Sequence, residues 1–155
     1  MEIRSIHAWD SNEAIVATAG QPALILKTID RGVTWKTVYE NKSPQAFFDG
    51  MKFWNVRSGV AFSDPVDGGL LIVKTDDGGN SWKAIEPASI PKMDKGEAGF
   101  AASNSSLHVF GNQHAWIGLG GGNEGPSRVF RSQDEGLHWT SHMAPQYGPP
   151  VQWAE

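Results

Sequence analysis

The sequence contains no cysteine, which excludes disulfide bonds, thiolate metal sites and a cysteine nucleophile. Charged residues are also scarce, at 19% of 155 residues against about a quarter in typical soluble domains. This scarcity argues against a disordered chain and against a bundle of surface helices. The formal net charge of −4 offers no electrostatic footprint for nucleic acid, so we expect no nucleic-acid partner.

Long hydrophobic runs are missing as well. The longest strongly apolar stretches, Ala23–Leu26 and Leu70–Val73, fall far short of the ~18 residues that a transmembrane helix needs, so no membrane span is expected. Residues Met1–His7 include no basic segment followed by an apolar run, and they do not have the pattern of a signal peptide. Composition alone therefore leaves the compartment open.

Helical periodicity is the third absence. No window shows convincing 3.6-residue periodicity, so we expect little or no helix. Instead, short β-rich runs alternate with joints of Gly, Asn, Asp and Pro, and the chain holds 18 glycines and 9 prolines. The sequence therefore predicts an all-β protein.

Three of the seven tryptophans end the same short motif: a hydroxyl residue, any residue, Asp, any residue, Gly, any two residues, Trp. We call these motifs box 1 (Thr28–Trp35), box 2 (Thr75–Trp82) and box 3 (Ser132–Trp139). The chain's own composition predicts only about 0.05 accidental Asp-x-Gly-x-x-Trp matches, so the three form a repeat. The box Asp residues are 47 and 57 residues apart. The first spacing is near the ~40–50-residue period of propeller blades, and the second implies an insertion of about ten residues.

Each box lies within a longer repeated unit. An aromatic residue (Trp9, Trp54 or Phe110) stands 21 to 24 residues before the box Asp, two β-rich runs follow it, and a fourth short run begins at the box Trp. Each unit therefore predicts four short strands, with the box joining the third to the fourth. The expected units cover residues 3–43, 47–90 and 105–144 approximately, and residues 145–155 are expected to form a tail or linker.

The boxes resemble the Asp-box, or BNR, repeat of sialidase-type and related β-propellers. The resemblance covers Ile3 to Met143 and is weaker in box 3, where His138 replaces the usual Ser or Thr. Segments Phe62–Gly68 and Gly96–Ser103 are similar, more narrowly, to bacterial oxidoreductase-like propellers related to the photosystem II assembly and stability factors. This family resemblance implies a β-propeller of four-stranded blades with Asp-box turns, and an exported or periplasmic full-length protein.

Three blades do not make a closed propeller, which needs about four to eight. The expectation is therefore an incomplete or fragmentary propeller whose chain lacks blades at both ends. The alternative is a homodimer that closes a six-bladed ring.

The box residues are predicted to be structural. The Asp accepts backbone N–H bonds within the turn, the Gly takes a positive φ at low cost, and the Trp packs over the hairpin. A catalytic group repeated in every blade would have no mechanistic logic. Trp9 and Trp54 are likewise expected in the core. The structural set is Asp30, Gly32, Trp35, Asp77, Gly79, Trp82, Asp134, Gly136 and Trp139.

Strand parity assigns the joints to two faces. The boxes share a face with the first-to-second joints, whereas the second-to-third joints and the connections between units share the opposite face. In the propellers that this sequence resembles, that opposite face usually carries the site, and here it also receives the insertion. The candidate ligand-binding residues on it are Asp64, Asp67, Glu97 and Asn123, with Asp49 and Glu124 behind them.

A structural alternative exists for these acids. Asp64 and Asp67 could cap a tight hairpin before Gly68-Gly69, and Glu97 could be a solvated loop charge. The face as a whole is expected to be acidic, which favours a partner with a basic patch, or a sugar, over nucleic acid.

No metal or cofactor site is predicted. The histidines lack metal-ligand spacing, and Gly118–Gly122 lacks the Lys-Ser/Thr of a phosphate loop. A sialidase needs an arginine cluster, yet Arg31 and Arg57 fall on the box face.

The leading prediction is a non-enzymatic binding or assembly scaffold with a protein or carbohydrate partner on the face opposite the boxes. The alternative is a glycoside hydrolase or sialidase-like enzyme whose site is completed by blades absent from this chain.

Overall fold

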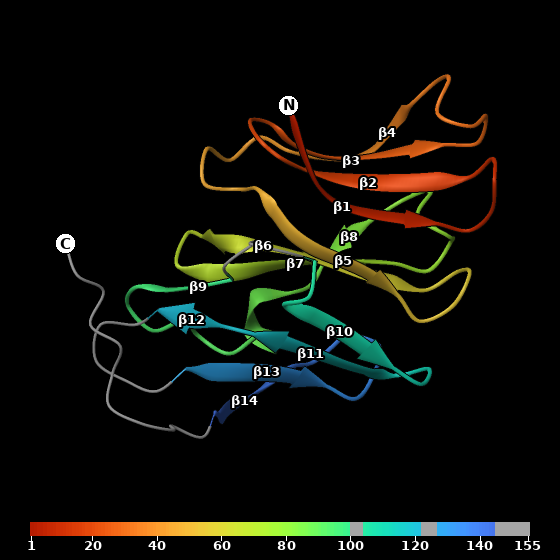
Figure 1. Cartoon of the computed structure of the whole chain (residues 1–155). Coiled ribbons are helices and arrows are strands. Elements are labelled where there is room, and N and C mark those ends of the chain that lie inside the picture. Colours follow the sequence, from red (N-terminus) through yellow and green to blue (C-terminus); the bar gives the residue numbers. More distant parts are fainter. Residues whose placement is uncertain (100–103, 122–126, 145–155) are drawn as a thin grey trace.

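The computed structural model describes residues 1–99, 104–121 and 127–144 (Figure 1). Within these ranges every regular element is a β-strand except one 3₁₀ turn, η1 (Pro87–Ser89). The strands form three four-stranded antiparallel sheets and one two-stranded ribbon. The prediction of an all-β protein is therefore confirmed.

Each four-stranded sheet contains one box, between its third and fourth strands, and we call the sheets blades 1 to 3. Blade 1 consists of β1 (Glu2–Ala8), β2 (Ala14–Ala19), β3 (Ala23–Thr28) and β4 (Lys36–Asn41). Blade 2 consists of β5 (Phe48–Phe53), β6 (Gly59–Val66), β7 (Gly69–Thr75) and β8 (Lys83–Ala84). Blade 3 consists of β10 (Leu107–Phe110), β11 (His114–Gly118), β13 (Arg128–Ser132) and β14 (Thr140–Met143). The ribbon pairs β9 (Glu97–Ala98) with β12 (Gly120–Gly121).

The blades meet through their first strands. Strand β5 packs against both β1 and β10, and Figure 1 shows blade 2 between the other two. Within each blade the chain then runs outward strand by strand, because successive strands are hydrogen-bonded neighbours. This is how propeller blades are arranged around a common axis.

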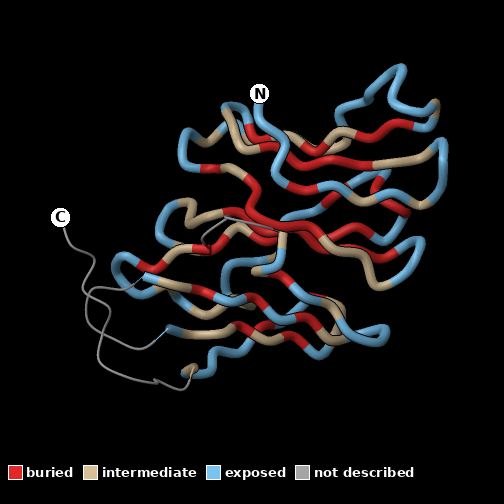
Figure 2. Tube along the Cα trace, viewed as in Figure 1, coloured by how far each residue is buried: buried red, intermediate tan, exposed pale blue. Residues whose placement is uncertain are grey.

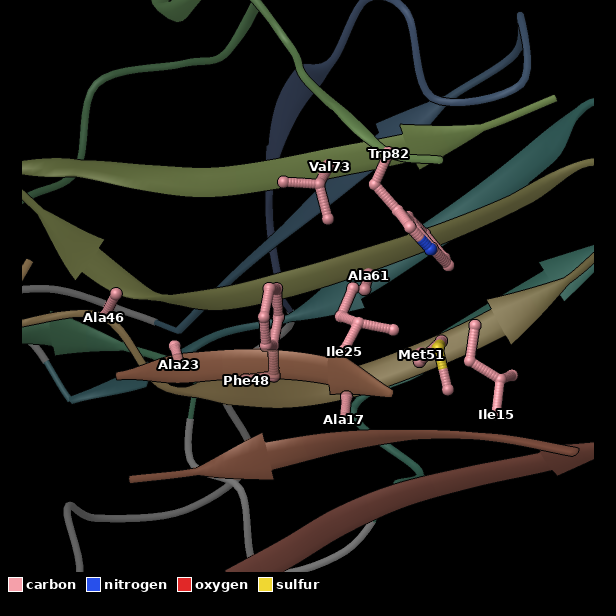
Figure 3. Close-up of a cluster of buried hydrophobic side chains, with 10 residues drawn as sticks. All are labelled: Ile15, Ala17, Ala23, Ile25, Ala46, Phe48, Met51, Ala61, Val73 and Trp82. Carbon is pink, nitrogen blue, oxygen red and sulfur yellow. The ribbon is translucent and has the colours of Figure 1, made fainter. Parts of the chain in front are cut away.

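The core consists of two apolar layers, one on each side of blade 2, and the buried segments in Figure 2 follow these layers. Because side chains alternate along a strand, blade 2 can supply both layers. Ala61 and Val73 face blade 1, and the cluster that they join is drawn in Figure 3. Their sequence neighbours Phe62 and Ile72 belong to the layer shared with blade 3.

Two irregularities in blade 2 affect the face opposite the boxes. The register between β5 and β6 shifts at Asp49, and the register between β6 and β7 shifts at Asp64, so each Asp occupies a bulge. The outer strand β8 is also only two residues long, and it pairs with Val73 and Lys74 alone.

Candidate binding face

The three boxes form the same hydrogen-bonded turn. In each, the Asp carboxylate accepts both the backbone N–H and the side-chain donor of the residue four positions on. The backbone distances are 2.8 Å for Asp30–Thr34, 3.0 Å for Asp77–Ser81 and 3.0 Å for Asp134–His138. In box 3 the Nδ1 atom of His138 takes the place of the hydroxyl, 2.7 Å from the carboxylate.

These hydrogen bonds occupy each box carboxylate within its own turn. Burial alone would raise the pKa of Asp77, but hydrogen bonds from Ser81 and Thr75 outweigh it and lower the pKa to about 2. For Asp30, which is half-buried, the hydrogen bonds from the side chain and backbone of Thr34 lower the pKa and outweigh the effect of burial. The geometry is that of a structural turn whose acid is held ionised by its own donors.

The turns also establish which joints share a face. The residue after each box Asp donates its backbone N–H to the first-to-second joint of the same blade. The pairs are Arg31 with Asn12, Gly78 with Arg57 and Glu135 with Gln113, at 2.8–3.0 Å. On the opposite side, the Gln21 side chain bonds the carbonyls of Pro44 and Ala46 in the connection between blades 1 and 2. We call this opposite side the loop face.

Asp64 faces inward from the loop face. It is half-buried, and its Oδ1 accepts the backbone N–H of Gly99 at 2.8 Å. Beside it, Asp49 is only 1% exposed, and neither of its carboxylate oxygens has a hydrogen-bond partner among the described residues. Burial, followed by the negative charge of Asp64, raises the pKa of Asp49 to about 8. Asp49 is therefore a neutral acid near pH 7 and adds no negative charge to this face.

Glu97 is not the solvated loop charge that the structural alternative assumed. Its side chain is buried, its Oε1 accepts Nε of Arg128 at 2.8 Å, and its Oε2 accepts a second guanidinium bond. The hydrogen bond from Arg128 lowers the pKa of Glu97 despite the cost of burial. Arg128 also donates to the carbonyl of Lys92, at 2.9 Å. The pair therefore fastens the long connection after β8 to β13, a role that the sequence pattern did not indicate.

Asp67 lies at the tip of the hairpin between β6 and β7. Asp67 and Gly68 both have positive φ, 53° and 82°, as a two-residue hairpin turn requires. Its side chain is exposed, and its backbone N–H bonds Gln45 at 2.9 Å. Asn123 and Glu124 lie outside the described residues. The three placed candidates thus do not converge on one point, and Asp67 is the exposed one.

An apolar groove of about 730 Å³, which the sequence reading missed, lies next to Asp67. It separates the β6–β7 hairpin from the connection after β8, and we call it the blade 2 groove. Its apolar lining includes Leu70, Leu71, Ile85, Ile90 and Met93. A sequence signal was available, because Ile85, Ile90 and Met93 are spaced along a connection that also contains Pro87 and Pro91.

The groove runs along an incompletely paired strand. Ile85 donates its N–H to the carbonyl of Ile72, which is the last outer bond that β7 makes toward β8. Because every second residue of a strand directs its N–H and C=O to the same side, the backbone groups of Leu70 also point away from β6, toward the β8 side. No hydrogen bond joins these groups to β8 or to the connection in the described part of the chain.

Metal-binding clusters and membrane-spanning helices were also sought among the described residues. In residues 1–99, 104–121 and 127–144, no group of three or more His, Cys, Asp or Glu side chains is placed to hold a metal ion. The same ranges contain no helix that is long and apolar enough to cross a membrane.

Comparison with known proteins identifies the fold. No family model and no curated protein matches the sequence. Among solved structures, the chain is similar to one described as "YCF48 bound to D1 peptide", with a TM-score of 0.55 and 20% identity. The match covers 90% of this chain but 39% of that one, so this chain spans well under half of the length of its structural neighbour. The chain therefore has a β-propeller fold.

Proposed function

We propose that this chain is part of a non-enzymatic binding scaffold of the Asp-box propeller type, whose partner is a protein. Residues 1–144 would form one partial propeller domain, and the loop face would carry the partner. The observation that carries the proposal is the blade 2 groove, because an apolar groove beside an unpaired strand edge is suited to an extended peptide.

The backbone supplies the first part of that argument. The outward N–H and C=O of Leu70 lie in an apolar groove, where a polar group without a partner is costly. An extended peptide laid along β7 would continue the pairing that β8 ends, which is strand addition at a sheet edge. Its alternate side chains would meet Ile85, Ile90 and Met93. The description of the structural neighbour as bound to a peptide supports the same class of partner for this chain.

The candidate acids fit a scaffold better than a hydrolase. A glycosidase needs two carboxyl groups flanking the bond to be cleaved. Here Glu97 is tied to Arg128, and Asp64 bonds the backbone of Gly99. Among the described residues of this face, no comparable observation favours a carbohydrate partner or a glycosidase site.

The test uses a peptide library displayed on phage as its probe. Peptides selected on the whole chain are labelled and titrated by fluorescence polarisation. Ile90→Arg places a charge in the groove and should weaken binding at least tenfold. Val56→Arg, on the exposed first-to-second joint of the box face, is the matched control and should leave binding unchanged. An equal loss of peptide affinity in both variants, or an affinity that Ile90→Arg leaves unchanged, would place the peptide elsewhere.

A further inference from the structure

The blades are joined by a contact that repeats in register with the boxes. The residue three positions before each box Asp is basic: Lys27, Lys74 or Arg131. In blade 1, Lys27 reaches across to box 2 and donates to the carbonyl of Gly78 at 2.8 Å. It also pairs with Glu13 of its own blade at 2.6 Å and lies over the ring of Trp9.

The same residues form a socket for the glycine of box 2. A Cβ placed on Gly79 would lie 2.6 Å from Ile15 and 3.6 Å from Trp9, so the turn is seated directly on blade 1. Glycine is required at this position for two reasons, since its φ of +80° is also unfavourable for other residues. The first socket therefore consists of Trp9, Glu13, Ile15 and Lys27.

Blade 2 seats box 3 with the equivalent residues. A Cβ on Gly136 would lie 3.4 Å from Trp54 and 3.6 Å from Val60. The side chain of Glu135 accepts a hydrogen bond from Ser58 at 2.7 Å and lies 3.5 Å from Nζ of Lys74. Two sockets are thus occupied, each by the box of the following blade.

Blade 3 presents a third socket of the same kind. The strand registers place Phe110, His114, Trp116 and Arg131 where the first socket has Trp9, Glu13, Ile15 and Lys27. These four residues and His108 line a surface cavity of about 400 Å³. Phe110 is 69% exposed and Trp116 39% exposed. The Arg131 guanidinium stacks 5.0 Å from the Trp116 ring, and its buried Nε has no hydrogen-bond acceptor among the described residues.

We propose that this third socket binds the box turn of another propeller blade, one with a small or acidic residue after its box Asp. The two occupied sockets define this chemistry, because Gly78 offers a carbonyl to Lys27 and Glu135 offers a carboxylate near Lys74. Arg131 needs an acceptor of the same kind. An acidic turn would complement the positive charge of Arg131, whereas a basic turn would meet like charge there.

Box 1 of a second copy of this chain is the nearest competitor for the socket. In the described part of the chain no other blade covers its turn, and Trp35 is 41% exposed, against 7% for Trp82 and 6% for Trp139. However, the residue after its Asp is Arg31, which would bring a cation to Arg131. The preference for a small or acidic residue after the box Asp, which we call the charge rule, therefore disfavours box 1 of a second copy. It also supplies a way to test the socket.

Arg31→Glu converts box 1 into a turn with the acidic residue of box 3. Glu is tolerated there because Arg31 and Glu135 share the same backbone conformation, with φ of 64° and 58°. Sedimentation velocity of the whole chain should show concentration-dependent association at least about tenfold tighter for Arg31→Glu than for the native chain. Adding Arg131→Ala or Trp116→Ala should abolish it, and Arg57→Glu, on the same face outside the boxes, should not reproduce it. Thermal unfolding of each variant confirms that it is folded.

Three results would overturn the proposal. Arg31→Glu could sediment like the native chain, which would mean that the socket does not take an acidic box turn. The self-association of Arg31→Glu could be unchanged by adding Arg131→Ala, which would place the contact elsewhere. The native chain could associate as tightly as the variant, in which case a second copy fills the socket and the charge rule is wrong.

Discussion

Replacing Asp49 by asparagine should make the stability of the protein less dependent on pH. Asp49 is buried at a bulge of β5 next to Asp64, and its pKa in the folded protein is raised to about 8, although the positive charge of Arg4 opposes the shift. In the unfolded chain an aspartate titrates near ~3.9. The folded state therefore retains a proton on Asp49 that the unfolded state has released.

The sign and size follow from this difference. A raised folded-state pKa gives stability that is fully present below about pH 4 and is lost as the pH rises through about 8. Each pH unit in that window costs about 1.4 kcal/mol, so the loss between pH 5 and pH 8 is on the order of 4 kcal/mol. That is a large share of the roughly 5–15 kcal/mol by which a domain is stable. The asparagine side chain of the variant stays neutral at every pH.

Urea unfolding at pH 5, 6, 7 and 8 measures the effect. The stability of Asp49→Asn relative to the native chain should rise by several kcal/mol between pH 5 and pH 8. Asp67→Asn is the matched control, because this exposed aspartate occupies a turn position that asparagine also adopts readily. An Asp49→Asn variant that loses stability with pH as steeply as the native chain would refute the reasoning, since the titrating group would then lie elsewhere.

Two further predictions concern single interactions. Asp77→Ala should lower the free energy of unfolding by roughly 1–3 kcal/mol, because it leaves the donors of box 2 unpaired, and chemical denaturation measures the change. An unchanged stability would argue against the structural role of the boxes. Arg128→Ala should cost about 3–5 kcal/mol, because it leaves Glu97 buried and charged without its partner. The double variant with Glu97→Ala should recover part of that loss, and a double variant as unstable as the sum of the two single variants would mean that the two side chains do not act as a pair.

The sequence by itself determined the repeated units and the turns, because both depend on contacts between residues close in the chain. Each box Asp bonds the residue four positions on, and each strand pairs with the next one along the sequence. Strand parity then assigned the boxes and the long connection to opposite faces before any tertiary contact was known. Even the His138 substitution in box 3 could be accommodated locally, since its ring nitrogen reaches the same carboxylate.

Only the tertiary structure decided what the acids and bases do. Glu97 and Arg128 are 31 residues apart, and only the path of the connection after β8 brings them together. Asp49 became a buried neutral acid because a bulge in β5 and a bulge in β6 place it against Asp64. The short β8 leaves the edge that forms the blade 2 groove. Arg131 has the same position in blade 3 as Lys27 and Lys74 have in blades 1 and 2, and the sockets around those two lysines form only where one blade packs on the next.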